Sequence, residues 1–106
     1  MDEALAMVAF QIISAVGAAR SCYIEAIQFA KLSDFAKSEQ SIKDGDEAFL
    51  EGHKSHAELI QQEAAGEGKG ITLLLLHAED QLMSAEGFKI VALEFIDVYK
   101  KFEDIK

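Results

Sequence analysis

The sequence predicts an all-α protein, folded as an antiparallel three-helix bundle whose helices run up, down and up. The chain contains no proline, which would interrupt a helix, and half of its residues are hydrophobic, enough for a core of Ala, Leu, Ile and Val. Apolar residues recur every three or four positions along three long segments, which is the period of an amphipathic helix. A length of 106 residues fits one domain, so we expect a single domain over residues 1–106.

The first helix, predicted over residues 2–31, is unusually apolar. Its seam consists of Leu5, Val8, Ile12, Val16, Ala19, Tyr23, Ala26 and Ala30. A second apolar stripe consists of Ala9, Ile13, Gly17, Ile24 and Ile27. One neighbouring helix cannot cover both stripes. We therefore expect this helix to lie centrally in the bundle or to face other copies of the chain.

An uncharged run over residues 4–19 raises the question of a signal peptide or a membrane span. Asp2 and Glu3 precede the run, where a signal peptide needs positive charge, and the run is shorter than the roughly 20 residues of a span. The single Cys22 excludes an internal disulfide framework and a cysteine-based zinc site. These features predict a cytoplasmic protein.

The second helix is predicted over residues 33–65, with Ser33 as its N-cap. It is the most charged segment, so we expect it to be the most solvated helix. Its sparse seam consists of Phe35, Ile42, Phe49, His53, His56 and Ile60. The triplet Asp44-Gly45-Asp46 is a turn signal, but the seam keeps its phase across the triplet. We therefore predict one continuous helix.

The third helix is predicted over residues 71–104, after the glycine-rich break at residues 66–70. A strand over residues 72–76 would have no partner strand, so a helix is favoured. One stripe of this helix consists of Ile71, Leu75, Ala78, Leu82, Ala85, Ala92, Ile96 and Tyr99. The other consists of Leu73, His77, Asp80, Ser84, Gly87, Val91, Phe95 and Val98.

The balance of charge excludes some classes of partner. Ten basic residues against 19 acidic ones give a formal net charge of −9. Binding to nucleic acid or to an anionic membrane relies on clustered Lys and Arg, which this chain lacks. A protein partner with a basic surface suits it better.

His77 and Asp80 are the residues best placed for chemistry. They share one face of the third helix, near its start, and a neutral imidazole is a competent nucleophile for a phosphoryl group. Two interpretations stay open on spacing alone: an ordinary surface pair, or a phosphoryl acceptor with a nearby carboxylate. A carboxylate on a mostly apolar stripe is costly unless it is paired or bound to a metal.

Other candidates carry weaker signals. His53 and His56 are spaced for a transition metal, although such pairs are more often hydrogen-bonded core or interface residues. The glycines at 66–70 follow no strand, so a chain reversal is favoured over a phosphate-binding loop. Cys22 has no adjacent base and is not expected to act as a nucleophile.

The residues from Leu75 to Met83, Leu-Leu-His-Ala-Glu-Asp-Gln-Leu-Met, resemble the phosphorylation region of the lactose/cellobiose-type enzyme IIA of the bacterial sugar phosphotransferase system. Residues 10–13 and 17–21 resemble the first helix of that family. Residues 33–35 resemble its first turn, and residues 59–67 resemble the end of its second helix. The matches follow in order along nearly the whole chain.

The resemblance implies a phosphotransferase component that trimerises and carries a phosphohistidine at His77. It implies that Asp80 and its two symmetry mates surround a divalent metal at the trimer axis, which the family leads us to expect is Mg²⁺. The implied phosphoryl donor is the histidine-containing phosphocarrier protein. The implied acceptor is a cysteine of the cognate enzyme IIB, for uptake of a lactose-, cellobiose- or chitobiose-type sugar.

Three positions depart from the family pattern. Glu79 stands where Gln is common, and it adds negative charge beside a site that must accept a phosphoryl anion. Gln81 stands where a second His is common, which leaves His77 as the only imidazole of the motif. Ala18 stands where Asp or Asn is frequent, and we have no physical account of its effect.

Two other functions compete with this one. A histidine phosphotransfer domain of a two-component relay also presents a His on a helix, but its usual His-x-x-Lys-Gly pattern is absent after His77. A helical oligomerisation or adaptor module without chemistry would leave His77 dispensable.

Overall fold

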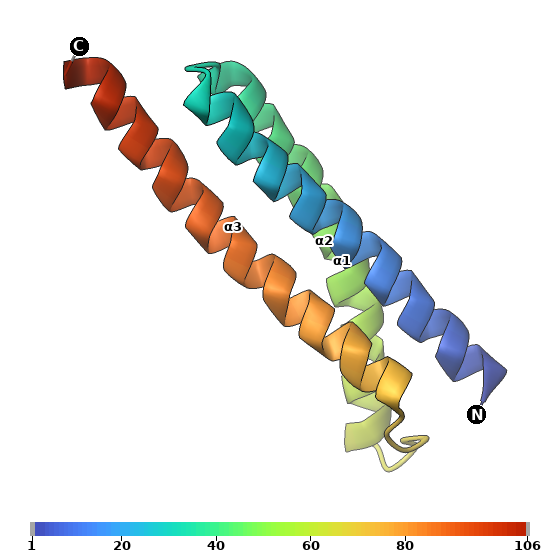
Figure 1. Cartoon of the computed structure of the whole chain (residues 1–106). Helices are drawn as coiled ribbons and strands as arrows, with labels where there is room; N and C mark the ends of the chain where they lie inside the picture. Colours follow the sequence, from blue (N-terminus) through green and yellow to red (C-terminus); the bar gives the residue numbers. More distant parts are fainter. Residues whose placement is uncertain (1, 106) are drawn as a thin grey trace.

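The fold is a bundle of three long helices, seen in a computed structural model that describes residues 2–105 (Figure 1). The helices are α1 (Glu3–Lys31), α2 (Phe35–Ala64) and α3 (Leu73–Ile105). α1 and α3 run parallel to each other and α2 runs antiparallel to both, in a molecule measuring 58 × 20 × 19 Å. The predicted bundle is confirmed, and each predicted helix end is correct within two residues. Met1 and Lys106 of the predicted domain lie outside the described residues.

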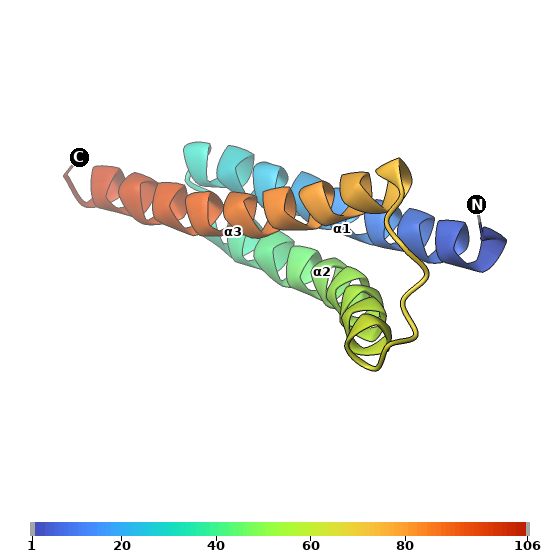
Figure 2. The ribbon, with the colours of Figure 1, turned by 90° about the horizontal axis from the view of Figure 1, so that it is seen from below.

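α1 lies centrally, which is one of the two arrangements that its apolar composition predicted. It packs against both α2 and α3, which contact each other far less. Figure 2 shows α2 diverging from the other two helices toward its C-terminal end. The buried residues of α1 are Leu5, Ala9, Ile12, Val16, Ala19, Tyr23, Ala26 and Ala30, nearly the predicted seam.

α1 is also long and apolar enough to cross a bilayer by length and composition alone. The central helix of a soluble bundle can be equally long and apolar, because it packs apolar side chains against the helices on both sides of it. The buried face of α1 against α2 and α3 accounts for part of that apolar character, since 28% of the most apolar window is buried in the bundle.

Two core clusters follow one another along the bundle axis. The cluster nearer the end of α1 consists of Ala19, Tyr23, Ala26, Ala30, Ile42, Ala92 and Ile96. The other consists of Ala9, Ile12, Val16, Ala78, Leu82 and Ala85. One polar network crosses all three helices: the Tyr23 hydroxyl donates to Asp46 Oδ1 at 2.7 Å, and Lys89 Nζ approaches the same oxygen at 3.0 Å.

α2 is continuous through Gly45, as predicted, and the structure explains why glycine stands there. A Cβ at Gly45 would lie 2.6 Å from Cε1 of Tyr23, and one at Gly52 would lie 2.7 Å from Cγ1 of Val16. Both distances are far below van der Waals contact. The two glycines therefore let α2 approach α1 closely, and the Asp-Gly-Asp triplet marks packing rather than a turn.

The predicted cap of the second helix is wrong by one residue. Asp34 is the N-cap and accepts a hydrogen bond from the Lys37 N–H at 3.2 Å. Ser33 instead adopts a left-handed conformation with φ of 62°, and its hydroxyl donates to Glu103 on α3 at 2.7 Å. A residue with that φ can turn the chain between α1 and α2 but cannot serve as the extended N-cap.

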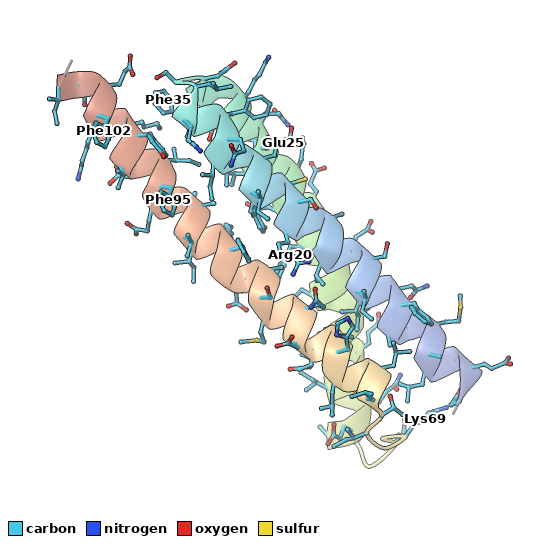
Figure 3. The ribbon with its side chains drawn as sticks, viewed as in Figure 1. Arg20, Glu25, Phe35, Lys69, Phe95 and Phe102 are labelled. Carbon is cyan, nitrogen blue, oxygen red and sulfur yellow. The ribbon has the colours of Figure 1, made fainter. Side chains whose placement is uncertain are left out.

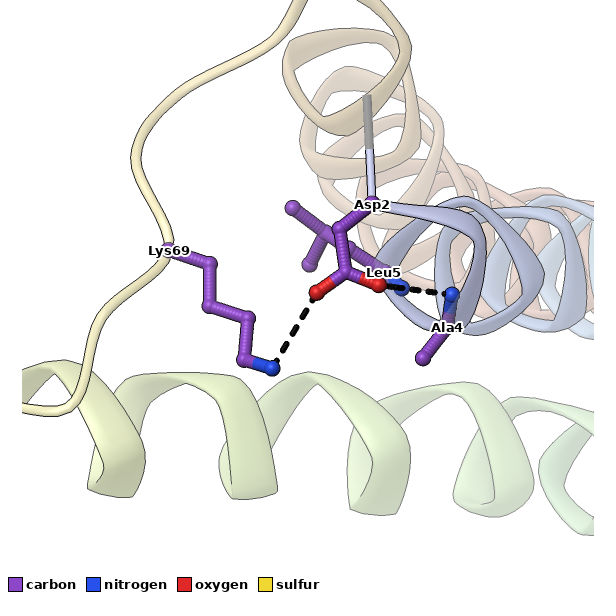
Figure 4. Close-up of polar contacts among 4 residues, drawn as sticks. All are labelled: Asp2, Ala4, Leu5 and Lys69. Atoms are coloured by element: carbon purple, nitrogen blue, oxygen red, sulfur yellow. Dashed lines mark hydrogen bonds and ion pairs between the residues drawn. The ribbon is translucent and has the colours of Figure 1, made fainter.

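The start of α1 is tied to the loop that precedes α3 (Figure 4). Asp2 caps α1 by accepting from the Ala4 N–H at 2.8 Å, and Lys69 donates to its other carboxylate oxygen at 3.1 Å. The Lys69 hydrogen bond, followed by those from the Ala4 and Leu5 amides, lowers the pKa of the Asp2 carboxyl. These contacts fix the loop at the end of the bundle where α3 begins.

Gly52→Ala is expected to destabilise the protein by about 1–3 kcal/mol, because its methyl group overlaps the stiff Val16 side chain. In a Val16→Ala background the same substitution fills the space that Val16 left, so its effect should be near zero or stabilising. Urea unfolding followed by circular dichroism of the four proteins measures this double-mutant cycle. Equal effects in both backgrounds would contradict the close contact.

Stability is expected to fall above about pH 10 through Tyr23. Burial, and then the hydrogen bond to Asp46, raises the pKa of the Tyr23 phenol. Above its ordinary pKa the unfolded chain loses the phenolic proton while the folded chain keeps it, so rising pH favours unfolding. Unfolding free energy measured from about pH 9 to 11 should decline less steeply for Tyr23→Phe than for wild type. The same slope in both proteins would contradict the raised pKa of the Tyr23 phenol.

Candidate functional site

The site is built on the first turns of α3. Gly70, with φ of 88°, turns the chain toward the helix, and Thr72 then caps it. The Thr72 hydroxyl accepts from the Leu75 N–H at 3.1 Å, and the Thr72 carbonyl accepts from the Leu76 N–H at 3.0 Å. The helix therefore begins at Leu73, two residues later than predicted. Thr72 was not predicted as the cap, although its residue type and its place before four leucines are a usable signal.

His77 lies in the second turn of this helix and is exposed. Helical side chains lean toward the N-terminus, so its imidazole projects back over the first turn. Thr72 engages the amide of Leu75 but leaves those of Leu73 and Leu74 without a partner in their own helix. An anion held by the imidazole would meet the positive end of the helix dipole.

Asp80 is exposed on the same face of α3, one turn after His77. Among the described residues, neither side chain has a hydrogen bond or an ion pair, and the two are not bonded to each other. The surface-pair interpretation therefore has no contact to support it. Both groups are free for a ligand or another chain.

An apolar stripe surrounds these two residues on the outer face of α3. Its large side chains are between 44% and 83% exposed and consist of Leu73, Leu76, Met83, Val91, Phe95, Val98 and Phe102. Figure 3 labels two of them, Phe95 and Phe102, toward the C-terminal end of α3. The stripe lies roughly opposite the buried residues Ala78, Leu82 and Ala85, so it is not a part of the protomer's core. Monomeric proteins rarely expose so long an apolar surface.

The other two histidines are engaged elsewhere. His56 is half-buried and forms a hydrogen-bonded pair with the Glu79 carboxylate. The His53 ring lies 6.0 Å from the ring of Phe49, centroid to centroid. They do not share a ligand set, and the described part of the chain holds no group of three His, Cys, Asp or Glu side chains arranged for a metal.

The His56 contact changes the interpretation of Glu79. Two residues along a helix correspond to a rotation of about 200°, so Glu79 and His77 point to nearly opposite sides of α3. Glu79 faces α2 and bonds His56, 23 residues away in sequence. The sequence placed this charge beside His77, and no local signal foretold its distant partner.

The remaining candidates have structural roles. Cys22 is half-buried, and burial, followed by the nearby charges of Asp44 and Glu25, raises the pKa of its thiol, which opposes a nucleophilic role. Gly66 and Gly70 both have positive φ, at 78° and 88°, and they reverse the chain between α2 and α3 as predicted.

Asp80 alone offers a metal one carboxylate, the type of ligand that Mg²⁺ prefers. One side chain cannot hold an ion of this kind. The residues of a single chain therefore fit a bound metal only where other copies supply equivalent carboxylates, and the exposed apolar stripe is a surface through which copies could meet.

Comparison with known proteins places this arrangement in a family. Residues 7–100 match the family described as the lactose/cellobiose-specific IIA subunit of the phosphotransferase system. The chain is 39% identical over 104 residues to the lichenan-specific phosphotransferase enzyme IIA component of Bacillus subtilis, covering 98% of this chain and 94% of that protein. It is 35% identical over 95 residues to the lactose-specific EIIA component of Staphylococcus epidermidis, covering 90% and 91%.

A solved structure agrees. The crystal structure of the cellobiose-specific enzyme IIA from Bacillus anthracis superposes with a TM-score of 0.90, at 46% sequence identity, over 92% of this chain and 90% of that one. The structural likeness therefore extends over nearly the whole chain.

Proposed function

The chain belongs to the lactose/cellobiose-specific IIA family of sugar phosphotransferase systems, and on that premise we propose that it carries a phosphoryl group on His77. As a member of this family it is a phosphotransferase component. The observation that carries the choice of residue is the state of the three histidines. His56 is paired with Glu79 and His53 lies against Phe49, whereas His77 is exposed without a bonded partner among the described residues.

The proposed reaction needs little beyond positioning and charge stabilisation. A nitrogen of the His77 imidazole forms a bond to phosphorus as the phosphorus–nitrogen bond of the donor's phosphohistidine breaks, and the donor nitrogen keeps the bonding electron pair. In the onward step a cysteine sulfur of enzyme IIB bonds to phosphorus, and the bond to His77 breaks. Between the two steps, the free amides and dipole at the start of α3 stabilise the phosphoryl anion.

We place the carrier in a homotrimer. The apolar stripe of α3 supports this assembly, because it needs a cover that the protomer does not provide. Three Asp80 carboxylates around the trimer axis would repel one another unless a cation lay between them. A divalent metal, for which we propose Mg²⁺, would be held by these three residues and would neutralise their charge.

The partners follow from the same proposal. The donor is the histidine-containing phosphocarrier protein and the acceptor is enzyme IIB, and an acidic carrier suits partners with basic docking faces. The relatives are named for lichenan, lactose and cellobiose, which supports a lactose-, cellobiose- or chitobiose-type sugar. The proposed place of action is the cytoplasm.

Wild-type protein incubated with phosphoenolpyruvate, enzyme I and the histidine-containing phosphocarrier is expected to gain one phosphoryl group by intact-mass spectrometry. His77→Gln should gain none, because it lacks the nucleophilic nitrogen. His53→Gln and His56→Gln are the matched controls and should still be phosphorylated. A folded wild type that takes no phosphoryl group from this donor would favour the two-component or adaptor functions instead.

Asp80→Leu is expected to abolish metal binding while leaving the trimer assembled, since the substitution removes both the ligand and the repulsion between carboxylates. Elemental analysis should find one divalent metal per wild-type trimer and none in the variant. Asp97→Leu is the control, because Asp97 instead pairs with Lys101 at 3.5 Å. Retention of one metal per trimer by Asp80→Leu would exclude Asp80 as the ligand.

A further inference from the structure

Arg20 is the only arginine of the chain, and it lies within its most apolar helix. It is half-buried and has no hydrogen bond or ion pair to any described residue. Figure 3 shows it on the side of α1 that is turned toward α3. Arg20 lies seven residues after Ile13 and four before Ile24, so the three share one side of α1. We call this surface the α1/α3 flank.

The core contacts of α1 fix the position of Arg20 along the long axis of the bundle, which we call its height. Val16 packs in the same core cluster as Ala85, and Arg20 follows Val16 by one helical turn. Because α1 and α3 run parallel, Arg20 lies at the level of α3 residues 86–89. His77 is several turns away along the axis, so Arg20 is not part of the phosphoryl site.

A groove runs along the other side of the bundle, where α2 and α3 diverge. We call it the α2/α3 groove; its volume is about 550 Å³, and it is lined by Tyr23, Asp46, Phe49, Leu50, His53, Glu86, Lys89, Ile90 and Leu93. Three of its apolar side chains are well exposed, Leu50 at 65%, Ile90 at 60% and Leu93 at 45%.

The charges in this groove are satisfied except for one. Asp46 accepts from the Tyr23 hydroxyl and pairs with Lys89, and His53 lies against the Phe49 ring. Glu86 is exposed and has no bonded partner among the described residues. The groove therefore presents apolar side chains together with one unbalanced negative charge.

The exposed stripe of α3 separates the groove from the α1/α3 flank, because Lys89 bonds α2 on one side of α3 and α1 packs on the other. In a ring of parallel copies around an axis that runs along this stripe, the α1/α3 flank of each copy faces the α2/α3 groove of the next copy. Rotation about that axis leaves the position of each residue along the bundle unchanged. Arg20 and Glu86 stand at the same height, carry opposite charges, and have no bonded partner among the described residues of their own chain.

We propose that the α1/α3 flank of one subunit seats in the α2/α3 groove of the next subunit, with Arg20 paired to the neighbour's Glu86. The inference rests on the proposed trimer and specifies its geometry. The contact is heterologous, joining two different surfaces, and it closes after three copies. Desolvated by the surrounding apolar side chains, the pair orients the subunits and opposes other arrangements.

Charge reversal tests the pairing through the oligomeric state of the full-length protein. Arg20→Glu and Glu86→Arg each place like charges together, and each is expected to raise the concentration at which the trimer dissociates on the order of tenfold or more. The Arg20→Glu/Glu86→Arg double variant restores opposite charges and should assemble like wild type. Sedimentation velocity over a dilution series measures this, with Lys43→Glu and Glu25→Arg as controls for the change in net charge.

Cross-linking gives a second measurement that does not depend on stability. In a Cys22→Ser background, Arg20→Cys together with Glu86→Cys should yield linked dimers and trimers with a short bismaleimide, and each single cysteine should not. The pairing would be overturned, with the trimer left intact, if both charge-reversal variants dissociated at the wild-type concentration. Cross-links formed only within one chain would overturn it in the same way. A wild type that is monomeric at every concentration would instead overturn the proposed trimer itself.

Discussion

The close packing of α1 between its two neighbours is the constraint on which the rest of the structure depends. Alanines along the buried face of α1 and glycines at positions 45 and 52 of α2 allow the helices to approach closely. Because α1 is the shared partner, α3 packs on α1 and barely on α2. The α2/α3 groove and the uncovered face of α3 are direct consequences of this arrangement.

The proposed phosphoryl site depends on how α3 begins. Gly70 reverses the chain, Thr72 caps the helix, and Lys69 ties the loop to Asp2 at the start of α1. These contacts hold the first turn of α3 at the end of the bundle, and His77 follows in the second turn. The chemistry proposed for His77 therefore draws on a helix end whose position is set by contacts to another helix.

Several ion pairs and hydrogen bonds join the helices, whereas a few charges that lie near the exposed face of α3 have no such partner among the described residues. Most charges that cross between helices serve the fold, among them Glu79 with His56 and Asp46 with Lys89. Asp80, Arg20 and Glu86 have no partner in the described chain, and each borders the exposed apolar surface of α3. Unsatisfied charge beside uncovered apolar area is the physical pattern of a surface that another chain completes.

The sequence by itself determined the three helices and the two stripes of α3, because helical period and apolar content are local properties. It left open whether α1 lies centrally or faces other copies. It also singled out His77 and Asp80. Only the tertiary structure decided which stripe of α3 is buried, why Gly45 continues a helix, and where Glu79 finds its partner. Those outcomes depend on contacts between residues far apart in the chain, such as His56 with Glu79 or Gly52 with Val16, which no local pattern encodes.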